Sequence, residues 1–163
     1  MRGGVAAAAV SLALLFAAPL AGAGSSRPSG MGSMTVTASP STAGAHGVRL
    51  RVTLHYEMQC NYPGAGPLVV TFPTAVKLPK QFADGSVLLA DNPVAATVDG
   101  QQVTVVVPPH RGILCTLMGP GSLKLTFTRA AKLANPARKG GYHFSATHLG
   151  RAFTATLSIK SAS

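Results

Sequence analysis

One segment of the chain alternates apolar and polar residues without interruption. The apolar members are Val48, Leu50, Val52, Leu54, Tyr56 and Met58, and between them stand Arg49, Arg51, Thr53, His55 and Glu57. Successive side chains of a β-strand point to opposite faces, so this period predicts a strand with one face buried and the other in water. A slip of one residue would expose the whole apolar set, so the pattern also fixes which residues face the core. Cys60 continues the apolar phase and is expected to point inward if the strand stays regular that far.

Shorter pieces of the same pattern recur along the chain. Strands are expected at 34–39, 68–72, 94–98, 101–105, 123–127, 142–147 and 152–157. A short strand at 86–89 is a further candidate, and Ile113, Cys115 and Leu117 share one parity. Pro- and Gly-containing turns are expected at 40–47, 61–67 and 119–121. The one helical candidate, Thr128 to Ala134, is limited to about one turn by Asn135-Pro136. About eight short strands with a turn every ten residues or so are typical of a sandwich or barrel.

Two hairpins are specific enough to predict a register. A two-residue loop at Asp99-Gly100 pairs Val98 with Gln101 and Ala96 with Val103. A loop at Leu149-Gly150 pairs large residues with small ones; it sets Tyr142, Phe144 and Ala146 opposite Leu157, Ala155 and Phe153. Leucine is a poor first residue for a tight hairpin turn, so a longer loop remains open there.

Several of these pieces stand in an order known from one family. They are VTFP at 70–73, VDGQQVTV at 98–105, Pro108, LKLTF at 123–127, ANP at 134–136 and GYHF at 141–144. The run from Leu68 to Ile159 resembles the immunoglobulin-like repeat of bacterial surface and secreted proteins. That resemblance implies an all-β, immunoglobulin-like antiparallel β-sandwich and implies no catalytic residues. The cysteine pair is a departure from most such repeats.

The N-terminus has the organisation of an export signal. Met1-Arg2 is a short basic region, Val5 to Leu20 is almost wholly apolar, and Ala21-Gly22-Ala23 fits the small-residue cleavage rule. The alternative is a transmembrane anchor, but the apolar run is short for one. We expect a signal peptide at 1–23, a flexible leader at 24–33, one domain at 34–160 and a tail at 161–163. The chain is then secreted, with no membrane anchor.

The cysteine content agrees with the predicted secretion. Cys60 and Cys115 are the only two cysteines. An even pair outside the cytoplasm is most simply a disulfide, and two cysteines alone supply too few ligands for a structural metal. We therefore expect a Cys60–Cys115 bond.

The charge balance is strongly basic. Lysine and arginine number 14 against 4 acidic residues, a formal net charge of +10. Such a surface attracts polyanions such as anionic cell-surface polymers, although scattered cations also serve solubility alone. The candidates for a polyanion contact flank the Asn135-Pro136 corner: Arg129, Lys132, Arg138 and Lys139. Nucleic acid is not the expected partner, because aromatic residues are not interleaved with these cations. An extracellular or cell-surface partner is expected, but the sequence does not identify it.

No motif for catalysis or for a cofactor is present. The sequence contains no GxSxG, HExxH or Walker pattern, and its four carboxylates are Glu57, Asp84, Asp91 and Asp99. We therefore expect a non-catalytic binding or structural module without a cofactor. The alternative is a metal-binding or enzymatic protein. It would use His55 and Glu57, which share the polar face of one strand, together with His143.

Overall fold

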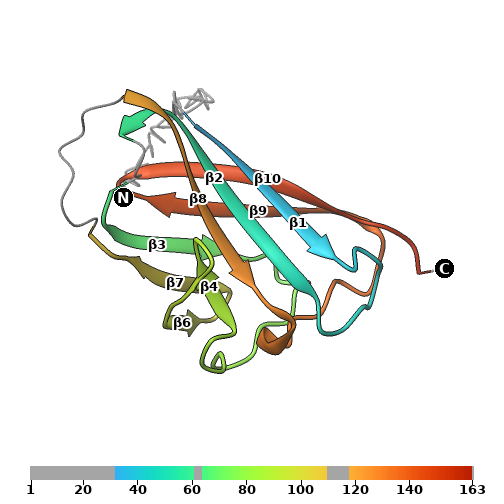
Figure 1. Cartoon of the computed structure of the whole chain (residues 1–163). Coiled ribbons are helices and arrows are strands. Elements are labelled where there is room, and N and C mark those ends of the chain that lie inside the picture. The colour runs from blue at the N-terminus through green and yellow to red at the C-terminus, as the bar shows by residue number, and fades with distance from the viewer. Residues whose placement is uncertain (1–31, 61–63, 110–117, 163) are drawn as a thin grey trace, which may run out of the picture.

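The computed structural model of the chain describes residues 32–60, 64–109 and 118–162. Within them, ten strands form two five-stranded antiparallel sheets. The strands are β1 (Gly32–Ser39), β2 (Arg49–Cys60), β3 (Gly66–Thr71), β4 (Val87–Leu89), β5 (Asn92–Pro93), β6 (Ala96–Asp99), β7 (Gln102–Val107), β8 (Met118–Phe127), β9 (Gly140–His148) and β10 (Arg151–Ile159). One sheet has the order β1-β2-β8-β4-β5, and the other β10-β9-β3-β7-β6. Figure 1 shows them as two stacked layers.

The alternation in β2 is confirmed residue by residue. Leu50, Val52, Leu54 and Tyr56 are buried, whereas Arg49, Arg51 and His55 are exposed. The inward side chains of β2 meet those of β1 and β8 in register, with Val52 opposite both Val36 and Leu125. Half-buried antiparallel strands of this kind bury one face against a second sheet.

The core lies between the two sheets. Aromatic side chains connect the layers: Phe72 makes edge contacts with Phe127 and Phe144, at ring-centroid distances of 5.4 and 5.2 Å. The edge strands β1 and β10 also lie against each other, so the layers meet along one side as well as face to face (Figure 1). The chain is thus an immunoglobulin-like antiparallel β-sandwich, as expected, with ten described strands rather than about eight.

The C-terminal hairpin has the predicted register. Phe153 is opposite Ala146, Ala155 opposite Phe144 and Leu157 opposite Tyr142. The loop is only Leu149-Gly150, and both residues have positive φ, at 51° and 71°. A type I′ turn needs positive φ at both positions, and an L-residue without a short polar side chain is strained there.

The other predicted hairpin register is wrong by two residues. Asp99 pairs with Gln102 and Val98 with Val103, so the loop is Gly100-Gln101. Gly100 has φ +57°, whereas Gln101 is not among the positive-φ residues, so glycine takes the first turn position as in a II′ turn. A shift of two preserves the side-chain faces, and Val98 and Val103 remain on the core side.

The turn expected at 119–121 is also wrong, because β8 continues through it. Gly121 pairs with Tyr56 and Gly119 with Gln59, and the register shifts between these pairs. Pro120 stands opposite this β-bulge, where a residue without an N–H is tolerated. The bulge also means that β2 is not regular up to Cys60, which was the condition for its inward direction.

Short irregular segments complete the domain. The expected single helical turn is the 3₁₀ helix η1 (Arg129–Ala131). β1 begins at Gly32, two residues before the expected start of the domain. No helix among residues 32–60, 64–109 and 118–162 has the length and apolar character of a membrane span.

Candidate functional site

Three connections gather at one end of the sandwich. They are residues 40–48 between β1 and β2, 72–86 between β3 and β4, and 128–139 between β8 and β9 (Figure 1). Ala134 holds them together, because it forms isolated β-bridges with both His46 and Lys77. Asn135 adds to this by donating hydrogen bonds from Nδ2 to the carbonyl oxygens of Pro40 and Thr42, each at 2.9 Å.

This end carries the predicted cations and two more. We call it the basic end and define it by six exposed residues: Lys77, Lys80, Arg129, Lys132, Arg138 and Lys139. None of the six has an ion-pair partner among the described residues. Sequence reasoning missed Lys77 and Lys80 because they are about fifty residues from the others, and only the Ala134 bridge brings that segment alongside.

The metal candidates are not brought together. His55 is exposed on the outer face of β2, and His143 is exposed on β9 of the other sheet. The two imidazoles therefore face away from opposite sides of the sandwich. His143 Nδ1 is 3.0 Å from Thr156 Oγ1 on the neighbouring strand. The side chain of Glu57 is outside the described residues, and no cluster of three metal-ligating side chains occurs within them.

The Cys60–Cys115 bond stays a prediction. Cys60 is the last residue of β2, its side chain is not described, and Cys115 lies outside the described residues.

A polar pair is buried between the sheets at the opposite end from the basic end. Tyr56 Oη is 2.7 Å from His148 Nδ1, and His148 is only 1% exposed. Burial raises the pKa of Tyr56 to about 12, although the nearby Arg151 charge counteracts part of this. Burial also lowers the pKa of His148, since the charged imidazolium would lose its hydration. Both side chains are therefore held neutral, which suits a structural role.

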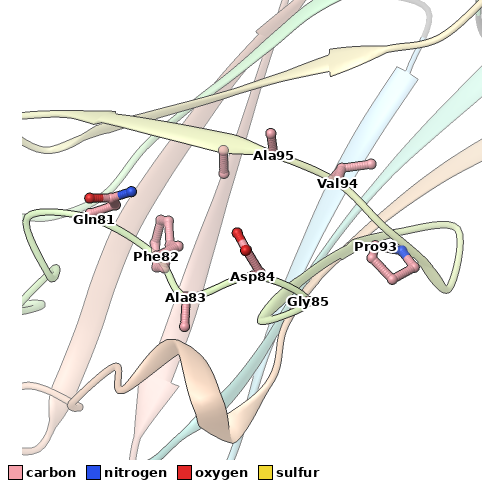
Figure 2. Close-up of a pocket in the computed structure, with 9 residues that line it drawn as sticks. Gln81, Phe82, Ala83, Asp84, Gly85, Pro93, Val94 and Ala95 are labelled. Carbon is pink, nitrogen blue, oxygen red and sulfur yellow. The ribbon is translucent and has the colours of Figure 1, made fainter.

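A pocket of about 310 Å³ opens beside β6. Figure 2 shows the Asp84 carboxylate on its loop, directed toward the segment that carries Val94 and Ala95. The remaining lining mixes the polar side chain of Gln81 with apolar residues such as Phe82 and Pro93. Asp84 has no hydrogen-bond or ion-pair partner among the described residues. Asp84 is the one carboxylate among the lining residues, so the pocket does not have the two carboxyl groups that hydrolysis of a glycoside requires.

The outer faces of the two sheets differ in charge. The outer face of the β1-β2-β8 sheet carries Arg49, Arg51 and Lys124. Lys124 Nζ is 2.5 Å from Asp91 Oδ2, and this hydrogen bond lowers the pKa of the Asp91 carboxyl.

The outward-facing positions of the other sheet carry no lysine or arginine, because Arg151, the first residue of β10, shares the inward parity of Phe153 and Leu157. We call this outer face the threonine face. Its outward side chains are Ala152, Thr154, Thr156 and Ser158 of β10, His143, Ser145 and Thr147 of β9, Pro67, Val69 and Thr71 of β3, Gln102, Thr104 and Val106 of β7, and Thr97 and Asp99 of β6. In one row, Ala152, Thr147, Val69, Thr104 and Thr97 stand side by side across all five strands.

Comparison with known proteins yields structural likeness alone. No family model matches the chain, and no curated protein matches it by sequence. Among solved structures, BslA, described as a bacterial hydrophobin, has a TM-score of 0.50 and 18% identity over 80% of this chain and 99% of that one. The collagen-binding domain of a Staphylococcus aureus adhesin follows with a TM-score of 0.43 and 12% identity, over 78% of this chain and 97% of that one. A non-cellulosomal cohesin from Archaeoglobus fulgidus has a TM-score of 0.38 and 13% identity over 80% and 92%.

At these identities the likeness shows the fold only. The BslA match covers nearly all of that chain, so this domain has about the extent of a complete sandwich of that kind. A fold of this class hosts many unrelated functions, so the function has to be argued from this chain's own surfaces.

Proposed function

We propose that this chain is a secreted, non-catalytic module that binds anionic cell-surface polymers through its basic end. The observation that carries the proposal is the gathering of six exposed cations, without ion-pair partners among the described residues, on two of the three connections that are tied together at Ala134. Clustered charges of one sign create a local potential that attracts a polymer of the opposite sign and speeds its association.

The rigid support of the basic end strengthens the argument. Asn135 is 7% exposed and bonds two carbonyls of the β1–β2 connection, while Gly44 N–H donates to the Pro136 carbonyl at 2.8 Å. The loops are therefore held in one arrangement before a ligand arrives. A surface ordered in advance loses less conformational entropy on binding.

The test uses immobilised dextran sulfate as the anionic polymer and neutral dextran as its control. The double variant Arg138→Ser with Lys139→Ser removes two cations from the basic end. The matched variant Arg49→Ser with Arg51→Ser removes two from the outer face of β2. At about 0.5 kcal/mol for each exposed contact, the first variant should weaken binding about fivefold and the second much less. Equal weakening by both would show that net charge alone governs retention and would overturn the proposal.

Secretion is tested separately. The mature N-terminus should lie within a few residues of Gly24, because Ala21-Gly22-Ala23 fits the cleavage rule. Intact-mass measurement of material released from cells gives the answer, and a released chain that retains residues 1–23 would contradict it.

A further inference from the structure

Among the described residues, no lysine or arginine is on the outward side of the threonine face. Its strands hold six outward threonines: Thr71, Thr97, Thr104, Thr147, Thr154 and Thr156. Most of the outward side chains are short β-branched or hydroxyl residues, with the longer His143 and Gln102 among them. The nearest lysines, Lys139 and Lys160, lie just beyond β9 and β10, toward the basic end.

The opposite end of the same face is apolar. Val106 is 68% exposed and Leu149 is 45% exposed, and they are the large hydrophobic residues most exposed in the described chain. Pro67 connects them, because it pairs with Val106 across β3 and β7 and lines a groove of about 420 Å³ together with Leu149. Leu149 holds a strained positive φ of 51° at this rim. Gly64 leaves room for its side chain, because a Cβ there would lie 2.6 Å from Leu149 Cδ1.

The distribution of charge over the protein favours a second copy of the chain as the partner of this face. Two copies of a protein with a net charge of +10 repel each other through their other broad surfaces. If two threonine faces stack, the basic outer sheets are separated by three sheet-to-sheet spacings of roughly 10 Å each. That separation of about 30 Å is several times the Debye length of about 8 Å at physiological ionic strength, so their repulsion is screened.

The area is sufficient for a weak dimer. Five strands at about 4.8 Å spacing are about 24 Å wide, and six residues at about 3.4 Å are about 20 Å long. The flat footprint is about 500 Å² per copy, and two copies reach the roughly 1,000 Å² at which specific interfaces begin. Face-to-face packing of two sheets with their strands within about 30° of each other is an ordinary mode of β-sheet contact.

We propose that the threonine face is the contact surface of a homodimer in which two copies stack sheet to sheet, with Val106, Pro67 and Leu149 forming its apolar side. The inference goes beyond polymer binding and does not depend on it. Apart from Asp99 on the edge strand β6, the contact is made by apolar and neutral polar groups, so added salt leaves it intact or strengthens it. Polymer binding at the basic end, by contrast, weakens with salt.

Sedimentation velocity of the secreted chain tests the dimer, at tens to hundreds of micromolar and in both 0.1 and 0.5 M NaCl. Thr104→Lys places a cation at the middle of the threonine face, and in a two-fold dimer it places two. Thr53→Lys is the matched control, because Thr53 is a half-buried threonine in the middle of the other outer face. We expect a dimer for the wild type and for Thr53→Lys, and at least a tenfold weaker dimer for Thr104→Lys.

Three outcomes would overturn the proposal. They are a wild type that stays monomeric throughout the range, a dimer lost only in Thr53→Lys, and a dimer that dissociates at 0.5 M NaCl. Thr154→Lys, at an exposed position of β10, replaces Thr104→Lys if circular dichroism shows that the latter is unfolded. A monomeric wild type that is retained by insoluble cellulose and released by the Thr104→Lys change would assign the face to a neutral polymer instead.

Discussion

Tyr56 and His148 are hydrogen-bonded across the interior and thereby join the two sheets. Tyr56 belongs to β2 and His148 to β9, and Oη lies 2.7 Å from Nδ1. In the neutral tautomer with its proton on Nε2, the tyrosine hydroxyl donates to Nδ1, and in the other neutral tautomer the hydroxyl accepts from Nδ1. Nε2 is buried and has no partner among the described residues. The pair is thus held by a single hydrogen bond. Loss of that bond leaves both ring nitrogens of His148 without a partner among the described residues.

Tyr56→Phe should destabilise the domain. The change preserves the ring and its edge contact with Phe153 at 5.3 Å but leaves His148 Nδ1 buried without its hydrogen-bond partner. A buried acceptor without its partner costs about 1–3 kcal/mol. Tyr142→Phe is the matched control, since its hydroxyl donates to the Arg138 carbonyl at 2.8 Å on the surface. Urea unfolding measures both, and an equal loss in the two variants would contradict the structural role of the buried pair.

Stability should also fall with acid through His148. Its folded pKa lies below the ordinary value of 6.5, so below about pH 6.5 the unfolded chain binds a proton that the folded chain excludes. This contribution is complete above pH 6.5 and is lost as the pH falls toward the folded pKa. The protonated imidazole has an N–H at both nitrogens, so Nδ1 could no longer accept a hydrogen bond from Tyr56. The checking measurement is the urea midpoint from pH 8 to pH 5, and His148→Gln should flatten this part of the profile relative to the wild type.

The sequence predicts the structure correctly where the residues of a single strand or a single hairpin contain all the information that is needed. The faces of β2 follow from strict alternation, and the register of β9 with β10 follows from the opposition of large and small residues around Leu149-Gly150. The turns at 99–100 and 119–121 were predicted wrongly because their local residues are compatible with more than one structure. Gly100 can occupy either position of a two-residue loop, and the glycines of 119–121 read as a turn unless β2 is known to pair with them.

The two proposed binding surfaces could not be predicted from local sequence, because each is assembled by contacts between distant segments. The hydroxyl residues of β9 and β10 share one predicted face, but β3 and β7 extend that face only because β3 pairs with both β9 and β7. Likewise, Arg129 to Lys139 form one cluster in the sequence, whereas Lys77 is added by its bridge to Ala134. Strand order between distant segments is not encoded in local periodicity, so a single sequence does not predict it.

The predicted Cys60–Cys115 disulfide should stabilise the oxidised chain. In the chain-entropy model, closing a loop of this length restricts the unfolded chain by about 4 kcal/mol. Thermal melts with and without reductant, beside the double variant Cys60→Ser with Cys115→Ser, measure the effect. The reduced wild type and the double variant should melt at similar, lower temperatures. If the double variant melted at the same temperature as the oxidised wild type, the bond would be absent or would not stabilise the domain.

Asn135 should be the most sensitive polar residue of the basic end. Its Nδ2 donates to the carbonyls of Pro40 and Thr42, and Asn135→Asp replaces that donor with an oxygen directed at two acceptors. The lost hydrogen bonds and the burial of a charge should cost at least about 2 kcal/mol at pH 7. Burial against carbonyls raises the folded pKa of the new carboxyl above about 3.9, so the loss should shrink as the pH falls and the acid becomes able to donate.

Asn92→Asp is the control for this change, because Asn92 is exposed and its Nδ2 donates to the Ala90 carbonyl at 3.1 Å. It adds the same charge and should cost under about 0.5 kcal/mol, as surface substitutions usually do. Urea unfolding of both variants at pH 7 and pH 5 distinguishes the effect of losing the Asn135 hydrogen bonds from the effect of adding one negative charge. If the two variants lose the same stability at pH 7, or if the loss in Asn135→Asp does not depend on pH, then the Asn135 side chain does not tie the β8–β9 connection to the β1–β2 connection. In that case the basic end is held by its backbone bridges alone.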